Sequence, residues 1–116
     1  MHAQTIIDAA EDWLRNSQAE DGDATMGDYI FDTPEFVWDV IMQLIQRDLS
    51  EEQLALLAAG PLEDLLALHG THFIDRIEQQ AQSSPKFAHL LGGVWRRGMP
   101  SEIWDRVERA RGSKVW

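Results

Sequence analysis

Apolar residues recur along most of the chain at intervals of three and four, the spacing that places them on one face of an α-helix. Seven segments show this spacing, over residues 6–14, 36–45, 54–58, 62–69, 73–81, 87–94 and 103–110. The strict alternation of apolar and polar residues that marks a half-buried strand is absent. Residues 36–45 are apolar nearly all round, because Trp38 and Met42 widen the main stripe. A helix with so little polar surface is predicted to lie centrally in the core.

Proline, glycine and hydroxyl side chains mark the ends of the predicted helices. Thr33-Pro34, Gly60-Pro61 and Ser84-Pro85 each place a proline where its fixed φ and missing N–H suit a first helical turn. Ser50-Glu51-Glu52-Gln53 is a capping box, in which the serine accepts from the third backbone N–H and the glutamine reaches back. Gly70 is predicted to end a helix. The sequence thus predicts an all-α fold, a compact bundle of about seven mostly short helices packed as consecutive helical hairpins.

The length of the chain fits one domain over residues 1–116. A chain of this size buries about two-thirds of its unfolded surface and needs no metal or disulfide to fold. It contains no cysteine, which excludes disulfides, thiolate metal sites and cysteine nucleophiles. No apolar run approaches the roughly 18 residues of a membrane span, and the N-terminus lacks a signal-peptide pattern. We therefore expect a soluble cytoplasmic protein without membrane contact.

Residues 58–95 carry the pattern G-P-L-E-x-L-L, H-G, I-x-x-I-E, P-x-F and V-W. The matching positions are Gly60, Pro61, Leu62, Glu63, Leu65, Leu66, His69, Gly70, Ile74, Ile77, Glu78, Pro85, Phe87, Val94 and Trp95. By this pattern the chain resembles an uncharacterised bacterial family of small helical domains. The resemblance implies no particular activity, and the acidic N-terminal third of the chain lies outside it.

Negative charge is concentrated near the N-terminus. The chain carries a net charge of -10, and residues 1–40 hold ten acidic residues against one basic residue. Residues 86–116 are the exception, with seven basic and three acidic residues. Such a field repels nucleic acid from most of the surface and attracts cationic partners. Nucleic-acid binding is therefore not expected, and a basic protein partner is.

The stretch QAEDGDATMGDYIFDTPEFVWD over residues 18–39 does not fit a calcium loop. An EF-hand loop starting at Asp21 would need a carboxylate where Thr25 stands and a glycine where Met26 stands. The glycine comes one residue late, at Gly27. A solvated loop between two helices is the simpler explanation of the acids and glycines.

Tyr29, Ile30 and Phe31 lie among these carboxylates, which a plain linker does not explain. Either they fold back into the core, or they are contact residues ringed by acids. Aromatic anchors among carboxylates have the composition of an interface for a basic protein. The predicted partner-binding residues are Asp21, Asp23, Asp28, Tyr29, Phe31, Asp32, Glu35 and Asp39.

Two histidines and two glutamates, Glu63, His69, His72 and Glu78, form a second candidate site. Together they could act as an acid–base or metal-binding set. The helix end predicted between the two histidines leaves no preset metal geometry, so no metal or other cofactor is expected. Glu63 fits a helix-capping role in a first turn, and Glu78 fits a partner for Arg76, for a neighbouring helix or for His69.

Trp95, Arg96 and Arg97 form the third candidate, because an arginine beside a tryptophan can bind phosphate or stack on a base. The surrounding acidity opposes that use. The two arginines are instead predicted to meet the acidic surface of the protein itself, with the N-terminal segment as counterpart.

These features favour a non-enzymatic acidic binding protein, a monomer or weak homodimer, over an enzyme. Its most concrete form is an immunity-type inhibitor that neutralises a basic protein such as a bacterial toxin. One alternative is a phage- or host-encoded inhibitor that mimics nucleic acid. The other is a small hydrolase or metal-dependent enzyme that uses the cluster of Glu63, His69, His72 and Glu78.

Overall fold

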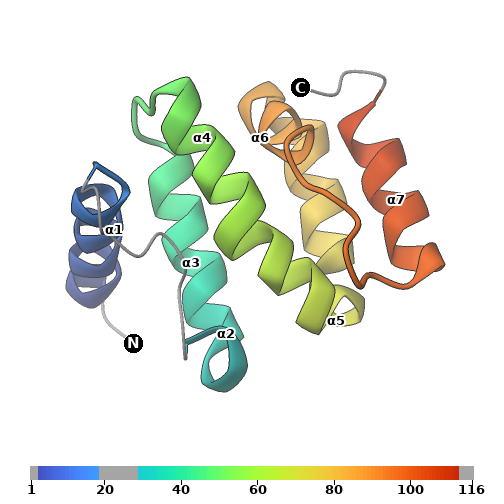
Figure 1. Cartoon of the computed structure of the whole chain (residues 1–116), viewed down its shortest axis with the longest axis horizontal. Coiled ribbons are helices and arrows are strands. Elements are labelled where there is room, and N and C mark those ends of the chain that lie inside the picture. Colours follow the sequence, from blue (N-terminus) through green and yellow to red (C-terminus); the bar gives the residue numbers. More distant parts are fainter. Residues whose placement is uncertain (1–2, 19–28, 113–116) are drawn as a thin grey trace.

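A computed structural model describes residues 3–18 and 29–112, and every regular element in those two ranges is helical (Figure 1). This confirms the all-α prediction for that part of the chain. In chain order the elements are α1 (Ala3–Gln18), α2 (Tyr29–Asp32), α3 (Pro34–Ile45), α4 (Glu51–Leu57), the π-helical turn η1 (Ala58–Leu62), α5 (Glu63–Ser83), α6 (Pro85–Leu91) and α7 (Ser101–Arg111).

Helix α3 lies at the centre of the core, as its nearly all-round apolar sequence predicts. Seven of its 12 residues are buried, among them Trp38. The Trp38 ring lies between Phe73 of α5, with ring centroids 5.9 Å apart, and Phe87 of α6, at 6.0 Å. Three helices that are distant in sequence therefore meet around one indole. Such aromatic pairs add stabilisation beyond the area they bury.

The helix break predicted at Gly60-Pro61 is wrong. Helices α4 and α5 are joined without a break through the π-helical turn η1, which contains Gly60 and Pro61 (Figure 1). Proline has no N–H to donate and clashes with the carbonyl four residues earlier, and a π turn relieves both conflicts by shifting the hydrogen-bond register. The chain therefore passes through the proline instead of restarting there. With this continuous segment counted once and the single turn α2 set aside, the described chain holds five helices and not about seven.

The helix end predicted at Gly70 is confirmed to within one residue, because α5 consists of two helical segments joined by a kink. The backbone bends one residue earlier, at His69 (φ −134°, ψ 24°), and α5 continues to Ser83. Gly70 is buried where α5 meets α7, and a Cβ at this position would lie 2.9 Å from Ile103 Cγ2. The glycine is needed for the close approach of the two helices.

Two of the three predicted side-chain caps are confirmed. Ser50 and Gln53 form the complete capping box of α4, and the Ser84 hydroxyl accepts from the Phe87 N–H at the start of α6. The Thr33 side chain makes no capping bond to α3, because its hydroxyl points back toward the Tyr29 carbonyl at 3.4 Å.

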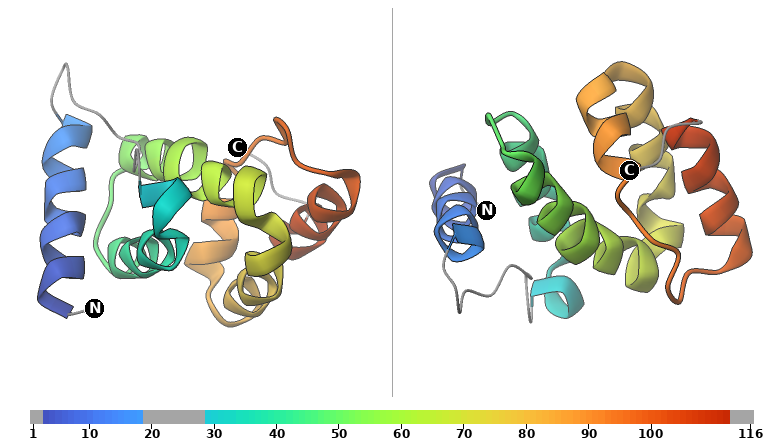
Figure 2. Two further views of the ribbon diagram at one scale, coloured as in Figure 1. Left: turned by 90° about the horizontal axis from the view of Figure 1, so that it is seen from below. Right: turned by 45° about the horizontal axis from the view of Figure 1, so that its top comes forward.

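The helices are arranged around the α4–α5 segment. Helix α1 lies at one side of the molecule against α3, and α6 and α7 pack on α5 at the other side (Figure 2). The Cα radius of gyration is 13.2 Å, close to the value of about 13 Å expected for a compact chain of this length. Among the described residues, no helix is long and apolar enough to cross a membrane.

Candidate functional site

The structure places only part of the predicted partner-binding set. Asp21, Asp23 and Asp28 lie outside the described residues, as does the side chain of Phe31. Tyr29 opens the single turn α2 and is 52% exposed. Its ring rests on Phe36 of α3, with ring centroids 5.0 Å apart. Tyr29 is therefore anchored at one edge while most of its ring faces solvent.

Asp32 and Asp39 are also exposed, one at the end of α2 and one in α3. Neither makes a hydrogen bond or an ion pair within 4 Å in the described part of the chain. Neither carboxylate is held by a direct bond, although Asp39 lies close enough to Arg76 to help raise the pKa of that guanidinium. Tyr29, Asp32 and Asp39 together are called the acidic surface below.

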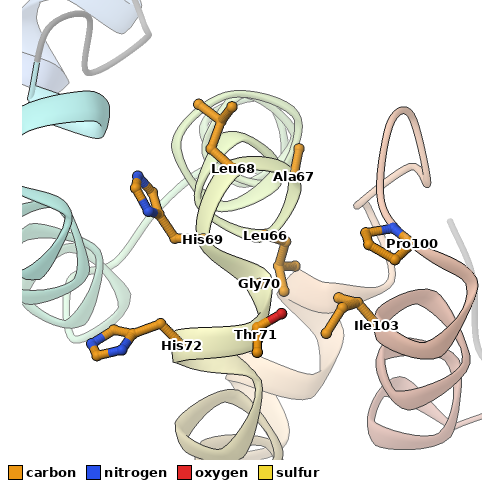
Figure 3. Close-up of a pocket in the computed structure, with 9 residues that line it drawn as sticks. All are labelled: Leu66, Ala67, Leu68, His69, Gly70, Thr71, His72, Pro100 and Ile103. Atoms are coloured by element: carbon orange, nitrogen blue, oxygen red, sulfur yellow. The ribbon is translucent and has the colours of Figure 1, made fainter.

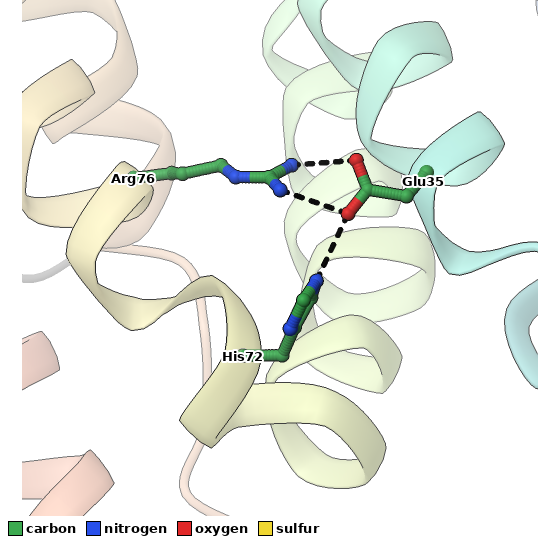
Figure 4. A network of polar contacts seen from close by, with 3 residues as sticks. All are labelled: Glu35, His72 and Arg76. Carbon is green, nitrogen blue, oxygen red and sulfur yellow. Dashed lines mark hydrogen bonds and ion pairs between the residues drawn. The ribbon is translucent and has the colours of Figure 1, made fainter.

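Glu35, another predicted partner-binding residue, already has partners inside the protein, although its side chain is 55% exposed. Its two oxygens accept from the Arg76 guanidinium at 2.8 and 2.9 Å, and one of them lies 3.0 Å from His72 Nε2 (Figure 4). The hydrogen bonds from Arg76 are the largest cause that lowers the pKa of Glu35, and His72 lowers it further. Glu35 thus joins α3 to α5, and its role in partner binding stays a prediction.

The second predicted site, the cluster of Glu63, His69, His72 and Glu78, is not assembled as one cluster. Glu63 bonds to the chain between α6 and α7, Glu78 to α7, and His72 to Glu35. Within residues 3–18 and 29–112, no group of three or more potential ligands is placed to hold a metal ion. The bend of α5 and the different partners of each side chain separate residues that are close in sequence.

A shallow pocket of about 340 Å³ lies at the bend of α5, and its walls are residues 66–72 of α5 with Pro100 and Ile103 (Figure 3). His69 and His72 are directed away from Pro100 and Ile103, so the imidazoles do not converge on the apolar wall. No carboxylate lines this pocket. It therefore lacks the acid–base pair that a hydrolytic site would need.

Glu78 holds α7 against α5. Its carboxylate accepts two hydrogen bonds from Arg106, and Asp75 accepts a third at 2.6 Å. These bonds lower the pKa of Glu78 and raise that of Arg106. Arg76, a neighbouring helix and His69 were the partners predicted for Glu78, and the structure shows the neighbouring helix, through Arg106 of α7. The Arg106 guanidinium is turned toward α5 and not toward Glu102, four residues earlier in α7.

Glu63 is the one charged side chain buried in the described chain, at 3% exposure, and it does not cap a helix as predicted. One oxygen accepts from the Trp95 backbone N–H at 2.8 Å, and the other from Arg97 Nη1 at 2.8 Å. Arg97 also lies 3.6 Å from Asp64, whose pKa is raised by burial. The carboxylate thus fixes the loop between α6 and α7.

The prediction that internal acids meet the arginine pair is correct for Arg97, but the counterpart is α5 and not the N-terminal segment. Arg96 instead donates to the Met99 carbonyl and to the Ser101 hydroxyl. Glu63 and Trp95 both belong to the sequence pattern noted above, in G-P-L-E and V-W. They are 32 residues apart, and the sequence gives no sign that they are in contact. The exposure of Trp95, at 72%, was not foreseen from the sequence.

A family model matches residues 9–115, and the chain belongs to this family, DUF6869, which is described as a family of unknown function. The prediction of an uncharacterised family is confirmed, and the match extends well beyond residues 58–95 to include the acidic segment. No curated protein and no solved structure matches the chain.

Proposed function

We propose that this member of the DUF6869 family is a non-enzymatic binding protein that covers a basic surface of a partner protein. The observation that supports this most is the exposed Tyr29, held against Phe36, together with the exposed Asp32 and Asp39, which make no direct hydrogen bond or ion pair within 4 Å in the described chain. An aromatic anchor that is already positioned loses little conformational freedom on binding. Such anchors dominate the energy of many protein interfaces.

The charge of the whole chain supports a cationic partner. The net charge of -10 produces a negative potential that accelerates the approach of a basic protein and disfavours acidic ones. Asp21, Asp23 and Asp28 precede Tyr29 directly in the sequence and add to the negative charge of this region.

In its most specific form, the proposal is an immunity-type inhibitor of a basic toxin such as a nuclease. A nuclease binds phosphates with lysine and arginine side chains, and those cations are the complement of a surface rich in carboxylates. An inhibitor of this kind would act in the cytoplasm, the compartment expected from the sequence. We interpret the pattern between Gly60 and Trp95 as structural, since Glu63 and Gly70 both serve packing or loop anchoring.

A capture experiment with charge-matched variants tests the proposal. The immobilised protein is exposed at low ionic strength to a lysate of its source organism, and bound proteins are eluted with increasing salt. The test variant carries five Asp→Asn substitutions, at Asp21, Asp23, Asp28, Asp32 and Asp39. The control variant neutralises five other acidic residues, Glu11, Asp48, Glu52, Glu102 and Asp105. A third variant, Tyr29→Ala, removes the aromatic anchor.

We expect one basic protein to bind the wild type and the control variant, to elute as salt rises, and to be lost from the test variant. Tyr29→Ala should weaken its binding by about tenfold or more, the usual effect of removing an anchor residue. Equal retention by the test and control variants would mean that total charge and not this surface determines binding. The recovery of only neutral or acidic proteins would contradict the proposal.

A further inference from the structure

The loop between α6 and α7 presents a large aromatic side chain to solvent. Trp95 is 72% exposed, more than Tyr29, and these two are the exposed aromatic side chains of the described chain. The loop lies at the side of the molecule opposite α1 (Figures 1 and 2). A tryptophan held so far out of the core gains little from folding, so its position calls for another explanation.

The loop is rigidly held on both sides of Trp95. Val94 and Met99 are buried at 3% and 2% exposure and fix its two ends in the core. Between them, Glu63 accepts from the Trp95 N–H and from Arg97, and the Met99 N–H donates to the Arg96 carbonyl at 3.0 Å. The indole is therefore projected from a fixed backbone. A fixed anchor has already lost the conformational freedom that binding would otherwise remove.

Three energetically unfavourable features meet at this loop. Arg97 has a positive φ of 46°, a strained value for a residue other than glycine. Glu63 is a buried carboxylate, which loses its hydration. The π-helical turn η1 ends directly before Glu63, and such turns, which are rare, are frequently found at functional sites. Strain and buried charge concentrated at one point indicate that the conformation of the loop serves more than stability.

The loop also carries positive charge that the protein does not fully neutralise. Arg97 is bonded to Glu63 and Asp64, yet its side chain remains 59% exposed. Arg96 is exposed, and in the described chain its guanidinium bonds to Met99 and Ser101 but to no carboxylate. A tryptophan beside exposed guanidinium groups fits a surface that combines carboxylates with an aromatic ring.

The acidic surface of Tyr29, Asp32 and Asp39 has that composition. Within one molecule the two do not pair, because the bonds of both arginines go to α5, Met99 and Ser101. We propose that the Trp95 loop docks on the acidic surface of a second copy of this chain. In a two-fold symmetric dimer each copy supplies both halves, so the contact forms twice.

This dimer uses the surface invoked in the proposed function, and a basic partner would compete with the second copy for it. The net charge of -10 opposes association of two copies. The dimer is therefore expected to be weak and to form as protein concentration rises. The dimer would cover the acidic surface while no partner is bound. A basic partner that binds more tightly would displace the second copy.

Sedimentation equilibrium of the purified full chain over a wide concentration range tests the inference. Trp95→Ala removes the anchor, and its control is Leu56→Ala, which removes another exposed apolar side chain, on α4. Arg96→Gln removes one cation, and its control is Arg109→Gln, which removes an exposed cation on α7. Asp32→Asn with Asp39→Asn changes the opposite half of the contact. Thermal unfolding of each variant verifies that the fold is intact.

We expect a dimer for the wild type and for both controls, and dimerisation weakened by about tenfold or more in Trp95→Ala and in the double aspartate variant. Arg96→Gln should show a smaller loss. A protein that stays monomeric at every concentration overturns the inference, and so does a dimer that Trp95→Ala leaves unchanged. The proposed function is judged separately, because capture of a basic protein by the acidic surface does not require the dimer.

Discussion

Glu63 Oε2 accepts a hydrogen bond from Arg97 Nη1 at 2.8 Å, which joins a buried carboxylate of α5 to an arginine with a left-handed backbone conformation. The other oxygen of the same carboxylate bonds the Trp95 N–H at 2.8 Å. Two bonds from one side chain therefore determine the path of the loop and the exposure of its tryptophan. The glutamate is 32 residues from Trp95 and 34 from Arg97, so folding alone brings them together.

Glu63→Gln should destabilise the protein by about 2 kcal/mol, because hydrogen bonds to an ionised, buried acceptor are worth roughly 1.5–3 kcal/mol. The amide can still accept one bond, but its NH₂ group faces the donors that the second oxygen served. Urea unfolding of the wild type and the variant measures the difference. Glu102→Gln, which changes an exposed glutamate, is the control and should stay within about 0.5 kcal/mol of the wild type.

Gly70→Ala should destabilise the protein by about 1–3 kcal/mol, the usual effect of overpacking a filled core. The added methyl group would lie 2.9 Å from Ile103 Cγ2, and the branched isoleucine side chain has little rotational freedom to move away. Thermal unfolding provides the measurement. Gly98→Ala is the matched control, since a Cβ there meets nothing within 4 Å, and it should be neutral. Equal stability of the two variants would show that the α5–α7 contact adjusts easily.

Ser50→Ala should lower stability by about 1 kcal/mol through the loss of the cap of α4. Thr33→Ala should have almost no effect, although both residues precede a helix and look alike in the sequence. The Thr33 side chain makes no capping hydrogen bond, so its removal leaves α3 unchanged. Chemical unfolding of both variants and the wild type measures the change in the free energy of unfolding for each. A larger loss for Thr33→Ala would contradict the cap assignment.

Acid should weaken the contact between α5 and α7. The hydrogen bonds from Arg106 lower the pKa of Glu78 below its ordinary value of 4.5. A carboxyl whose pKa is lowered by folding contributes stability above its unfolded pKa, and this contribution disappears as pH falls through the folded value. Glu78→Gln should therefore be less stable than the wild type at neutral pH. The difference should shrink to nearly nothing at a pH well below 4.5.

Unfolding curves of the wild type and Glu78→Gln from neutral pH into the acid range test this dependence. The Arg106–Glu78 pair is about one-third exposed and is partly screened by solvent, so the difference at neutral pH is expected to be modest. Asp105→Asn is the control, because Asp105 is exposed and has no ion pair in the described chain. A difference that stays constant over the whole pH range would show that the charge of Glu78 is irrelevant.

The spacing of apolar residues predicted which segments are helical better than it predicted where each helix begins and ends. The apolar spacing identified α1, α3, α6 and α7, and the all-round apolar face of α3 correctly placed it in the core. The break predicted at Gly60-Pro61 was wrong, whereas the one predicted at Gly70 occurs one residue earlier, at the His69 kink. A glycine or proline favours a helix end locally, but packing of the α4–α5 segment against its neighbours outweighs that preference.

The candidate sites were harder to predict than the helices. Tyr29, Asp32 and Asp39 emerged from the composition of one acidic stretch, and the structure places them at the surface. Glu35 came from the same stretch, yet it is paired with Arg76 across 41 residues. No local pattern carries that information. The acidic surface could likewise be proposed from local composition, whereas the exposed Trp95 loop could be found only in the structure.

The sequence alone determined the helical class, the central place of α3 and the excess of negative charge, because periodicity and composition are properties of nearby or summed residues. Tertiary structure alone decided which carboxylates are neutralised and which tryptophan is left outside. Those outcomes depend on which side chains the packing of distant segments brings within hydrogen-bonding distance, and only at Glu63 does burial also disfavour an unpaired charge. The partners of Glu35, Glu63 and Glu78 are accordingly all on other segments of the fold.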